Sequence, residues 1–300
     1  MAIGPKPRVV GGGLTSIVTT VDNETVLKGY EVWWNGRLTG KCHEPCEERM
    51  LREDTIYRHL GEHPRILKSL GLQQIRPGVH SLRLEMAPLG CLRAYLLNNS
   101  DDIPSIQARL RMALDMAEGL QYMHSQGVFN LDLSTRNLFV FDGLRVKIGD
   151  LGASVFRDRD DFKVDQSYEG RYSLPLRGRE YDELPIMKRE LFALGCAVYE
   201  ITAWQVPFSH VDSCEAEQMY DRSEFPSLDG NPARDVIWDC WYEKFAAAGE
   251  VVCQLDRLVS SSVWRAVSAT GDDVLGNRLR RTVHHESREF RPNHSLPPIL

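Results

Sequence analysis

The order of apolar and polar positions predicts strands in the first part of the chain. Residues 9–21 and 24–30 flank a polar turn at Asp22 and Asn23, which predicts a β-hairpin followed by a third strand. Residues 66–75 and 80–90 predict two further strands, joined by a Pro-Gly connection. The beginning of the chain is therefore expected to be rich in strands.

Residues 44–60 change to a helical period, with Met50 and Tyr57 seven residues apart. Glu53 falls on the same apolar face, and a carboxylate on a buried face needs a partner. Lys28, on the strand before this helix, is the nearest candidate in the sequence. The alternative is that Glu53 is a partly exposed surface acid. The other acids of the helix are expected to point to solvent: Glu47, Glu48 and Asp54.

Long helices are predicted after about residue 87. Apolar side chains recur at helical spacing within residues 103–127: Ile106, Leu110, Ala113, Leu114, Ala117 and Leu120. Residues 190–204 are apolar nearly all round, which predicts a helix buried at the centre of this part. From about residue 267 the chain loses apolar periodicity and gains basic residues and prolines, which predicts a mobile tail.

A short hairpin is predicted inside the helical part. Leu138 and Val140 alternate with their neighbours, and Val146 and Ile148 do the same on the other side of Asp142-Gly143. This dipeptide is a strong signal for a two-residue hairpin turn. Two strands are therefore expected to fold back on each other here.

Three polar side chains should meet at the open end of this hairpin. Asn137 and Asp150 lie at comparable distances from the turn on opposite strands, and Asp132 lies just upstream. One amide and two carboxylates are hard oxygen ligands, which suit Mg²⁺ held together with phosphates better than they suit Zn²⁺. The alternative is that the aspartates are turn and capping residues.

Composition narrows the possible functions. The chain has 300 residues, of which 42% are hydrophobic and 26% charged, as in ordinary globular proteins, and its net charge of −6 argues against a nucleic-acid partner. The N-terminus has no apolar core of signal-peptide length, and no run of about 18 apolar residues occurs. We therefore expect no membrane association and a cytoplasmic or nuclear location.

Of seven cysteines only Cys42 and Cys46 are close, which favours free thiols over a zinc site.

Four short motifs follow one another along the chain: "VLK" at residues 26–28, "RLEMAPLG" at 83–90, "NLDLSTRN" at 130–137 and "GDLG" at 149–152. Residues 9–258, which contain them, resemble a divergent eukaryotic protein kinase domain. In that family the motifs correspond to the strand with the phosphate-anchoring lysine, the hinge, the catalytic loop and the metal-binding motif. Asn137 lies five positions after Asp132, as the family's loop requires, and Asp150 lies thirteen positions after Asn137.

The resemblance implies an α+β, bilobal protein-kinase-like fold. A small β-rich N-lobe with one key helix would span about residues 9–84, a hinge 85–90, and a larger, mainly α-helical C-lobe 91–258. Residues 267–300 would form a basic, mobile tail outside the domain. The implied activity is transfer of the γ-phosphate of ATP, with Mg²⁺, to a protein hydroxyl, with serine or threonine favoured.

The resemblance also implies roles for single residues. Lys28 would be the cation on the phosphates, held by Glu53, and Asp132 would accept the proton of the substrate hydroxyl. Asn137 and Asp150 would ligate Mg²⁺. Further residues would line the nucleotide through the glycine loop, the hinge and the walls of its site: Gly11, Gly13, Val18, Val26, Leu84, Glu85, Met86, Ala87 and Phe139.

The catalytic loop, residues 130–137, departs from the family pattern. Asn130 and Leu131 replace its His and Arg, and Ser134 stands where serine/threonine kinases commonly have Lys. Arg136 resembles the tyrosine-kinase version, so the type of hydroxyl stays open. Because Leu131 offers no cation to a phosphate, we expect the activation segment, residues 153–176, not to depend on phosphorylation. Its candidate sites are Ser154, Ser167, Tyr168, Tyr172 and Ser173, and the cations that could substitute are Arg157, Arg159 and Arg171.

Other departures lie outside the catalytic loop. Ser16 takes the place of a third glycine, and Leu151 that of a Phe. Leu176 and Ala248 stand where the family has the Glu and Arg of a buried ion pair, so both halves are missing together, which can be neutral. Glu190 replaces an Asp and is expected still to reach the backbone of the catalytic loop.

Two other functions fit parts of the pattern. A pseudokinase would keep the fold as a nucleotide-binding or interaction scaffold, which the altered glycine loop and catalytic loop favour. A small-molecule kinase of the aminoglycoside-phosphotransferase type would share the Asp, Asn and Asp spacing. It would lack the long segment that residues 153–176 supply, so it is the weaker alternative.

Overall fold

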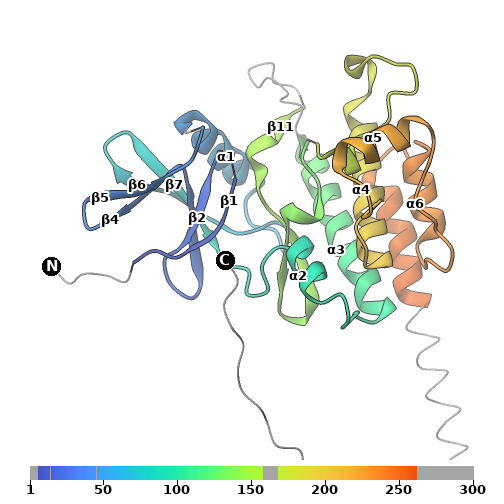
Figure 1. Ribbon diagram of the computed structural model, residues 1–300, viewed down its shortest axis with the longest axis horizontal. Helices are drawn as coiled ribbons and strands as arrows, with labels where there is room; N and C mark the ends of the chain where they lie inside the picture. The colour runs from blue at the N-terminus through green and yellow to red at the C-terminus, as the bar shows by residue number, and fades with distance from the viewer. Residues whose placement is uncertain (1–5, 14, 45, 158–167, 262–300) are drawn as a thin grey trace, which may run out of the picture. The chain divides into compact units, whose positions relative to one another are not determined.

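The computed structural model describes residues 6–13, 15–44, 46–157 and 168–261 (Figure 1). Residues 1–260 form one compact unit, to which the following description applies. A second unit, residues 261–300, lies almost wholly outside the described residues, as does the predicted tail.

An antiparallel sheet of five strands forms the first part of this unit, in the order β1-β2-β3-β7-β6. Asp22 accepts hydrogen bonds from the backbone of Glu24 and Thr25, which closes the turn between β2 and β3. Gly78, at φ +76°, occupies the turn between β6 and β7. The strands are β1 (Val9–Gly12), β2 (Ile17–Thr20), β3 (Thr25–Gly29), β6 (Ser69–Arg76) and β7 (Val79–Glu85).

A second hairpin, β4 (Glu31–Trp34) and β5 (Arg37–Lys41), follows β3 and was not predicted. Asn35 and Gly36 both have positive φ in its turn, at +50° and +72°. Asn-Gly is the usual sequence of such a turn, because both residues tolerate this conformation. The signal was therefore present in the sequence.

Helix α1 (Glu47–Leu60) confirms the predicted helix and ends at Gly61. The expected exposure of its acids is right for Glu48 and wrong for two others. Asp54 is fully buried and pairs with Arg58 one turn later. Glu47 accepts a hydrogen bond of 2.7 Å from the Tyr30 hydroxyl.

The rest of the unit is mainly helical, as predicted. Ser105 caps α3 by accepting a hydrogen bond from the Ala108 N–H. All but four residues of α4 are buried, which confirms the helix expected at the centre of this part. The elements are α2 (Leu92–Asn98), α3 (Ile106–Ser125), α4 (Ile186–Ala203), α5 (Ser213–Asp221), α6 (Arg234–Trp241) and the helical residues 248–261. Among the residues described, no helix is both long and apolar enough to cross a bilayer.

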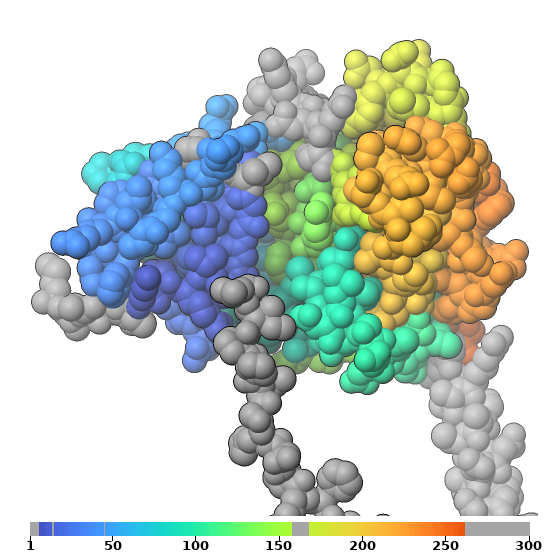
Figure 2. All heavy atoms as spheres, viewed as in Figure 1, coloured from blue at the N-terminus to red at the C-terminus, as the bar shows by residue number. Residues whose placement is uncertain are grey.

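The predicted hairpin is present as β9 (Leu138–Phe141) and β10 (Arg145–Ile148), paired antiparallel. Its turn takes in Leu144 as well as Asp142-Gly143, and is one residue longer than predicted. The middle of the chain, coloured green, lies between the blue N-terminal strands and the yellow and orange helices (Figure 2). The expected α+β fold is confirmed.

The missing ion pair of Leu176 and Ala248 has a replacement close by in the sequence. Leu176 is 38% exposed and Ala248 is buried, and neither side chain carries a charge. Arg179 instead donates two hydrogen bonds of 2.9 and 3.0 Å to the two oxygens of Glu243. Arg177 adds a contact of 3.4 Å to the same carboxylate. The same two regions are therefore joined by a pair with the charges exchanged.

We expect Arg179 and Glu243 to be energetically coupled. In a double-mutant cycle of Arg179→Ala and Glu243→Gln, urea unfolding should give a coupling free energy of about 1–2 kcal/mol, because the pair is bidentate and half-buried. The exposed pair of Lys244 and Asp239 serves as control and should give under about 0.5 kcal/mol. Equal coupling in both cycles would contradict a structural role for the exchanged pair.

Candidate functional site

Lys28 joins three separate parts of the chain. From β3, its Nζ lies 2.6 Å from Glu53 Oε2 on α1 and 2.6 Å from Asp150 Oδ1, just after β10. Lys28 and Glu53 are buried, whereas the Asp150 side chain is 44% exposed. The contact expected from the apolar face of α1 is thus present, and of the three side chains Asp150 is the one accessible to solvent.

Lys28 remains charged despite its burial. Burial lowers the pKa of its ammonium, but the charges of Asp150 and Glu53 outweigh this and raise the pKa above its usual value. Burial likewise raises the pKa of Asp150, but Lys28 outweighs it, so this pKa lies below its usual value. A cation and an exposed carboxylate therefore stand side by side at neutral pH.

Asp132 and Asn137 are held together by the fold of the catalytic loop. The Asn137 amide nitrogen donates to the Asp132 carbonyl at 2.8 Å and to its Oδ2 at 2.9 Å. The Gly149 N–H donates to the Asn137 carbonyl at 2.9 Å, which fixes the loop beside Asp150. Burial, followed by the charge of Asp150, raises the pKa of the Asp132 carboxyl to about 7. Asp132 can therefore exchange a proton near neutral pH.

The oxygen donors fit a Mg²⁺ ion shared with a nucleotide. Asn137 uses its amide nitrogen on Asp132, and its amide oxygen makes no hydrogen bond to the described residues. In the described part of the chain, no group of three or more His, Cys, Asp or Glu side chains could hold a metal by itself. One amide and one carboxylate suit a hard cation that takes its other ligands from water and phosphates.

The residues expected around the adenine come from three elements. Leu84 is buried on β7 and faces Val26 across the pairing with β3. The Met86 N–H donates to the Glu24 carbonyl at 2.7 Å, whereas the Ala87 N–H has no acceptor within the described residues. Free backbone groups of this kind can pair with a heterocyclic base. The Glu85 side chain is engaged elsewhere, with Lys147 at 2.6 Å.

The other predicted nucleotide residues lie on strands or, for Gly13, in the loop after β1. Gly11 packs on Val18 across the β1-β2 pair, and the Gly13 N–H donates to the Ser16 carbonyl at 2.8 Å, which forms the loop between these strands. A Cβ at Gly149 would lie 2.7 Å from the Phe139 ring, so the ring covers the backbone just before Asp150.

The catalytic loop rests on two buried glutamates of α4. Glu190 accepts from the Asn130 N–H at 2.9 Å and the Leu131 N–H at 2.8 Å, so its expected reach is confirmed. Glu200 pairs with Arg93 and accepts a 2.7 Å bond from the Tyr172 hydroxyl. Sequence reasoning missed this second contact, although a glutamate in the apolar stretch 190–204 was a signal that a buried partner must exist.

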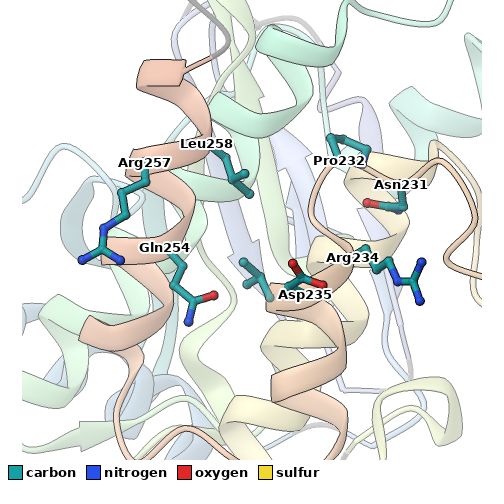
Figure 3. Close-up of a pocket in the computed structure, with 8 residues that line it drawn as sticks. Asn231, Pro232, Arg234, Asp235, Gln254, Arg257 and Leu258 are labelled. Atoms are coloured by element: carbon teal, nitrogen blue, oxygen red, sulfur yellow. The ribbon is translucent and has the colours of Figure 1, made fainter.

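A hollow of about 420 Å³ between α6 and residues 248–261 contains none of the predicted site residues (Figure 3). Arg234 and Arg257 line it, but their guanidinium groups point away from each other, and Asp235 lies between them. No convergent set of charges marks it as a second site.

A family model for protein tyrosine and serine/threonine kinases matches residues 37–247, which is more than half of the chain. The chain belongs to the protein kinase family. The resemblance noted in the sequence is thus confirmed, and the fold is that of a kinase domain. The match begins after Lys28 and so does not include this lysine, which contacts two residues within the matched range, Glu53 and Asp150.

Similar kinases include enzymes named for different hydroxyl types. Serine/threonine/tyrosine-protein kinase HT1 of Arabidopsis thaliana is 29% identical over 60% of this chain and 47% of its own length. Dual specificity testis-specific protein kinase 1 of Homo sapiens is 33% identical over 51% of this chain and 25% of its own. Tyrosine-protein kinase FRK of Homo sapiens is 24% identical over 70% and 44%. The kinase chain thus matches less than half the length of each.

We expect Asp132→Asn to stabilise this kinase domain increasingly as pH rises. The native carboxyl, with a pKa of about 7, keeps its proton to higher pH than it does in the unfolded chain. Its stabilising contribution is therefore present at acid pH and lost as pH rises through 7. Urea unfolding at pH 5 and pH 8 should show the gain growing by about 1–2 kcal/mol. The exposed Asp142→Asn is the control, and a gain that does not change with pH would contradict the burial argument.

Proposed function

We propose that the protein is an ATP- and Mg²⁺-dependent protein kinase that transfers the γ-phosphate to a protein hydroxyl. The observation that carries the proposal is the contact of Lys28 with both Glu53 and Asp150. It supports an assembled site, because the cation for the phosphates and a ligand for the metal are already adjacent. A cytoplasmic or nuclear location, and the lobe boundaries near residues 84 and 91, stay predictions.

Each site residue has one task in the proposed reaction. Lys28 binds the phosphates and is oriented by Glu53, while Asn137 and Asp150 would hold Mg²⁺. The metal, when bound, neutralises the charge of the transferring phosphoryl group. Asp132 orients the substrate hydroxyl and takes its proton, for which a pKa near neutrality is suited. The free Ala87 N–H, with the hinge backbone, would bind the adenine.

We propose serine or threonine as the acceptor, with tyrosine as the alternative outcome. Two observations favour the alternative: Arg136, beside Asp132, resembles the tyrosine-kinase version of the loop, and similar kinases are named for dual specificity. Phosphoamino-acid analysis of a modified generic substrate separates the outcomes.

A pseudokinase is the second candidate function. Lys28 forms an ion pair directly with one carboxylate oxygen of Asp150. A chain that binds no metal could keep this ion pair as a structural element. Against this stands the retention of Asp132, which a scaffold would not need, in a position that raises its pKa.

Asp132→Asn should separate the two candidates. With Mg-ATP and a generic protein substrate, we expect phosphate transfer to fall by roughly 10²–10⁴-fold in the variant, because the proton acceptor is lost. Binding of Mg-nucleotide, measured by calorimetry, should change little, because Asp132 is not a proposed ligand. If wild-type protein transferred no phosphate, or if the variant equalled it, the proposed role would be wrong.

Lys28 and Glu53 should act as one unit. Lys28→Met and Glu53→Gln should each lower kcat/KM by about tenfold or more, and the double variant should be little worse than the poorer single one. The exposed pair of Lys68 and Glu62 is a matched control, and Lys68→Met should leave the rate near that of wild type. Strictly additive losses at Lys28 and Glu53 would show that they do not cooperate.

A further inference from the structure

The described end of the activation segment is joined to the catalytic loop through one carboxylate oxygen. The Tyr168 hydroxyl donates to Glu190 Oε1 at 2.7 Å, and the Leu131 N–H donates to the same oxygen at 2.8 Å. Glu190 is fully buried at the centre of the helical part. The segment and the residue before Asp132 therefore share one acceptor.

Leu131 needs this support because of its backbone conformation. Its φ is +62°, in the left-handed region, which costs a residue other than glycine on the order of 1–2 kcal/mol. Such a conformation persists only where the surroundings hold it. Here the Glu190 oxygen holds the N–H, and the Leu131 side chain, 1% exposed, lies in an apolar cluster with Phe129 and Val155.

The Tyr168 ring covers the same apolar cluster. In related kinases an arginine at the position of Leu131 could pair with a phosphate, and here an aromatic ring and an aliphatic side chain pack together instead. Burial and the charge of Glu190 raise the pKa of Tyr168 well above its usual value, so the hydroxyl remains a donor.

The next residue adds an anion that needs no modification. Glu169 has a side chain only 7% exposed and lies 3.4 Å from Arg136 of the catalytic loop and 3.4 Å from Arg171. A carboxylate encoded in the sequence thus neutralises the cation beside Asp132. The segment is joined to the loop at two successive residues without any phosphate.

We propose that Tyr168 is a positioning residue, which holds Leu131 and so Asp132 in place through Glu190 and replaces a phosphate-dependent contact. The inference rests on the proposed kinase function for its effect on rate, but not for its effect on the loop. Without the hydroxyl, Glu190 Oε1 loses a donor and the ring loses its anchor, so the loop should open more often.

Hydrogen exchange tests the positioning role independently of catalysis. In Tyr168→Phe, which keeps the ring, backbone amides in peptides covering residues 128–137 should exchange about tenfold faster than in wild type. Tyr30→Phe is a matched control, since it removes another Tyr–Glu hydrogen bond of 2.7 Å, to Glu47, and should leave these peptides unchanged. Unchanged exchange in Tyr168→Phe would overturn the proposal whatever the activity.

Kinetics tests the consequence for the reaction. In phosphatase-treated protein, verified by mass spectrometry, wild type should keep its activity and Tyr168→Phe should lose about tenfold in kcat with the KM for Mg-ATP unchanged. Because partial unfolding would also lower the apparent kcat with KM unchanged, kcat is expressed per folded enzyme, with the folded fraction measured by circular dichroism. If wild type transferred no phosphate while exchange in Tyr168→Phe still rose, the proposed function would fail and the positioning of Leu131 would stand.

A second pair of variants guards against misfolding of Tyr168→Phe. Leu131→Arg introduces the residue of related kinases into an apolar cluster, so it should accelerate exchange and lower kcat by about tenfold or more. Leu131→Met conserves the volume and should behave like wild type. Full activity and slow exchange in Leu131→Arg would overturn the proposal.

Discussion

A buried ammonium group must have anionic partners, and this constraint determines how the first part of the chain meets the rest. Lys28 cannot lie within the sheet uncompensated, because an isolated buried charge costs more than a domain can supply. Its two partners come from α1 and from the end of β10, at positions 25 and 122 residues further along the chain. The sheet, the helix and the hairpin therefore depend on one another for their positions, because each carries one member of this buried ion-pair cluster. The arrangement of the proposed phosphate and metal ligands follows from this one charge.

The same reasoning applies on the helical side, with the sign reversed. Glu190 and Glu200 are fully buried acids of α4. They pair with His124 of α3 and Arg93 of α2, and they also accept hydrogen bonds from segments that the reaction would use. Asn130 and Leu131 donate from the catalytic loop, and Tyr172 from the activation segment. A helix that is apolar on all sides is a rigid support, so the two carboxylates position the loops that lie over it. The position of the Asp132 side chain is thus determined by contacts of its loop with the buried core helix.

How far the sequence predicts this site depends on whether a contact is local or long-range. The hairpin that brings Asn137 and Asp150 together was readable, because strand alternation and Asp142-Gly143 fix it within a dozen residues. Helical period placed Glu53 on the apolar face of its helix and made a buried partner one of two alternatives, the other being a partly exposed surface acid. The predicted exposure of Asp54 was wrong, because neighbouring elements cover more of the surface of α1 than one apolar stripe. Two successive acids, Glu53 and Asp54, are therefore both buried. No period could show that Tyr168 meets Glu190, since that contact depends on how the activation segment folds back.

Two of the departures from the kinase pattern come with a compensating change nearby, which argues for a retained arrangement at these positions. Loss of the arginine at 131 alone would leave a polar gap next to the activation segment, but the leucine there is packed against Phe129 and Val155, with Tyr168 over them. Loss of the glutamate at 176 alone would strand an arginine, but Ala248 carries no charge and Arg179 and Glu243 join the same regions. Removing one member of a buried pair is costly, whereas replacing both is tolerated. A chain under no constraint would accumulate single losses, and at these positions each change has its counterpart.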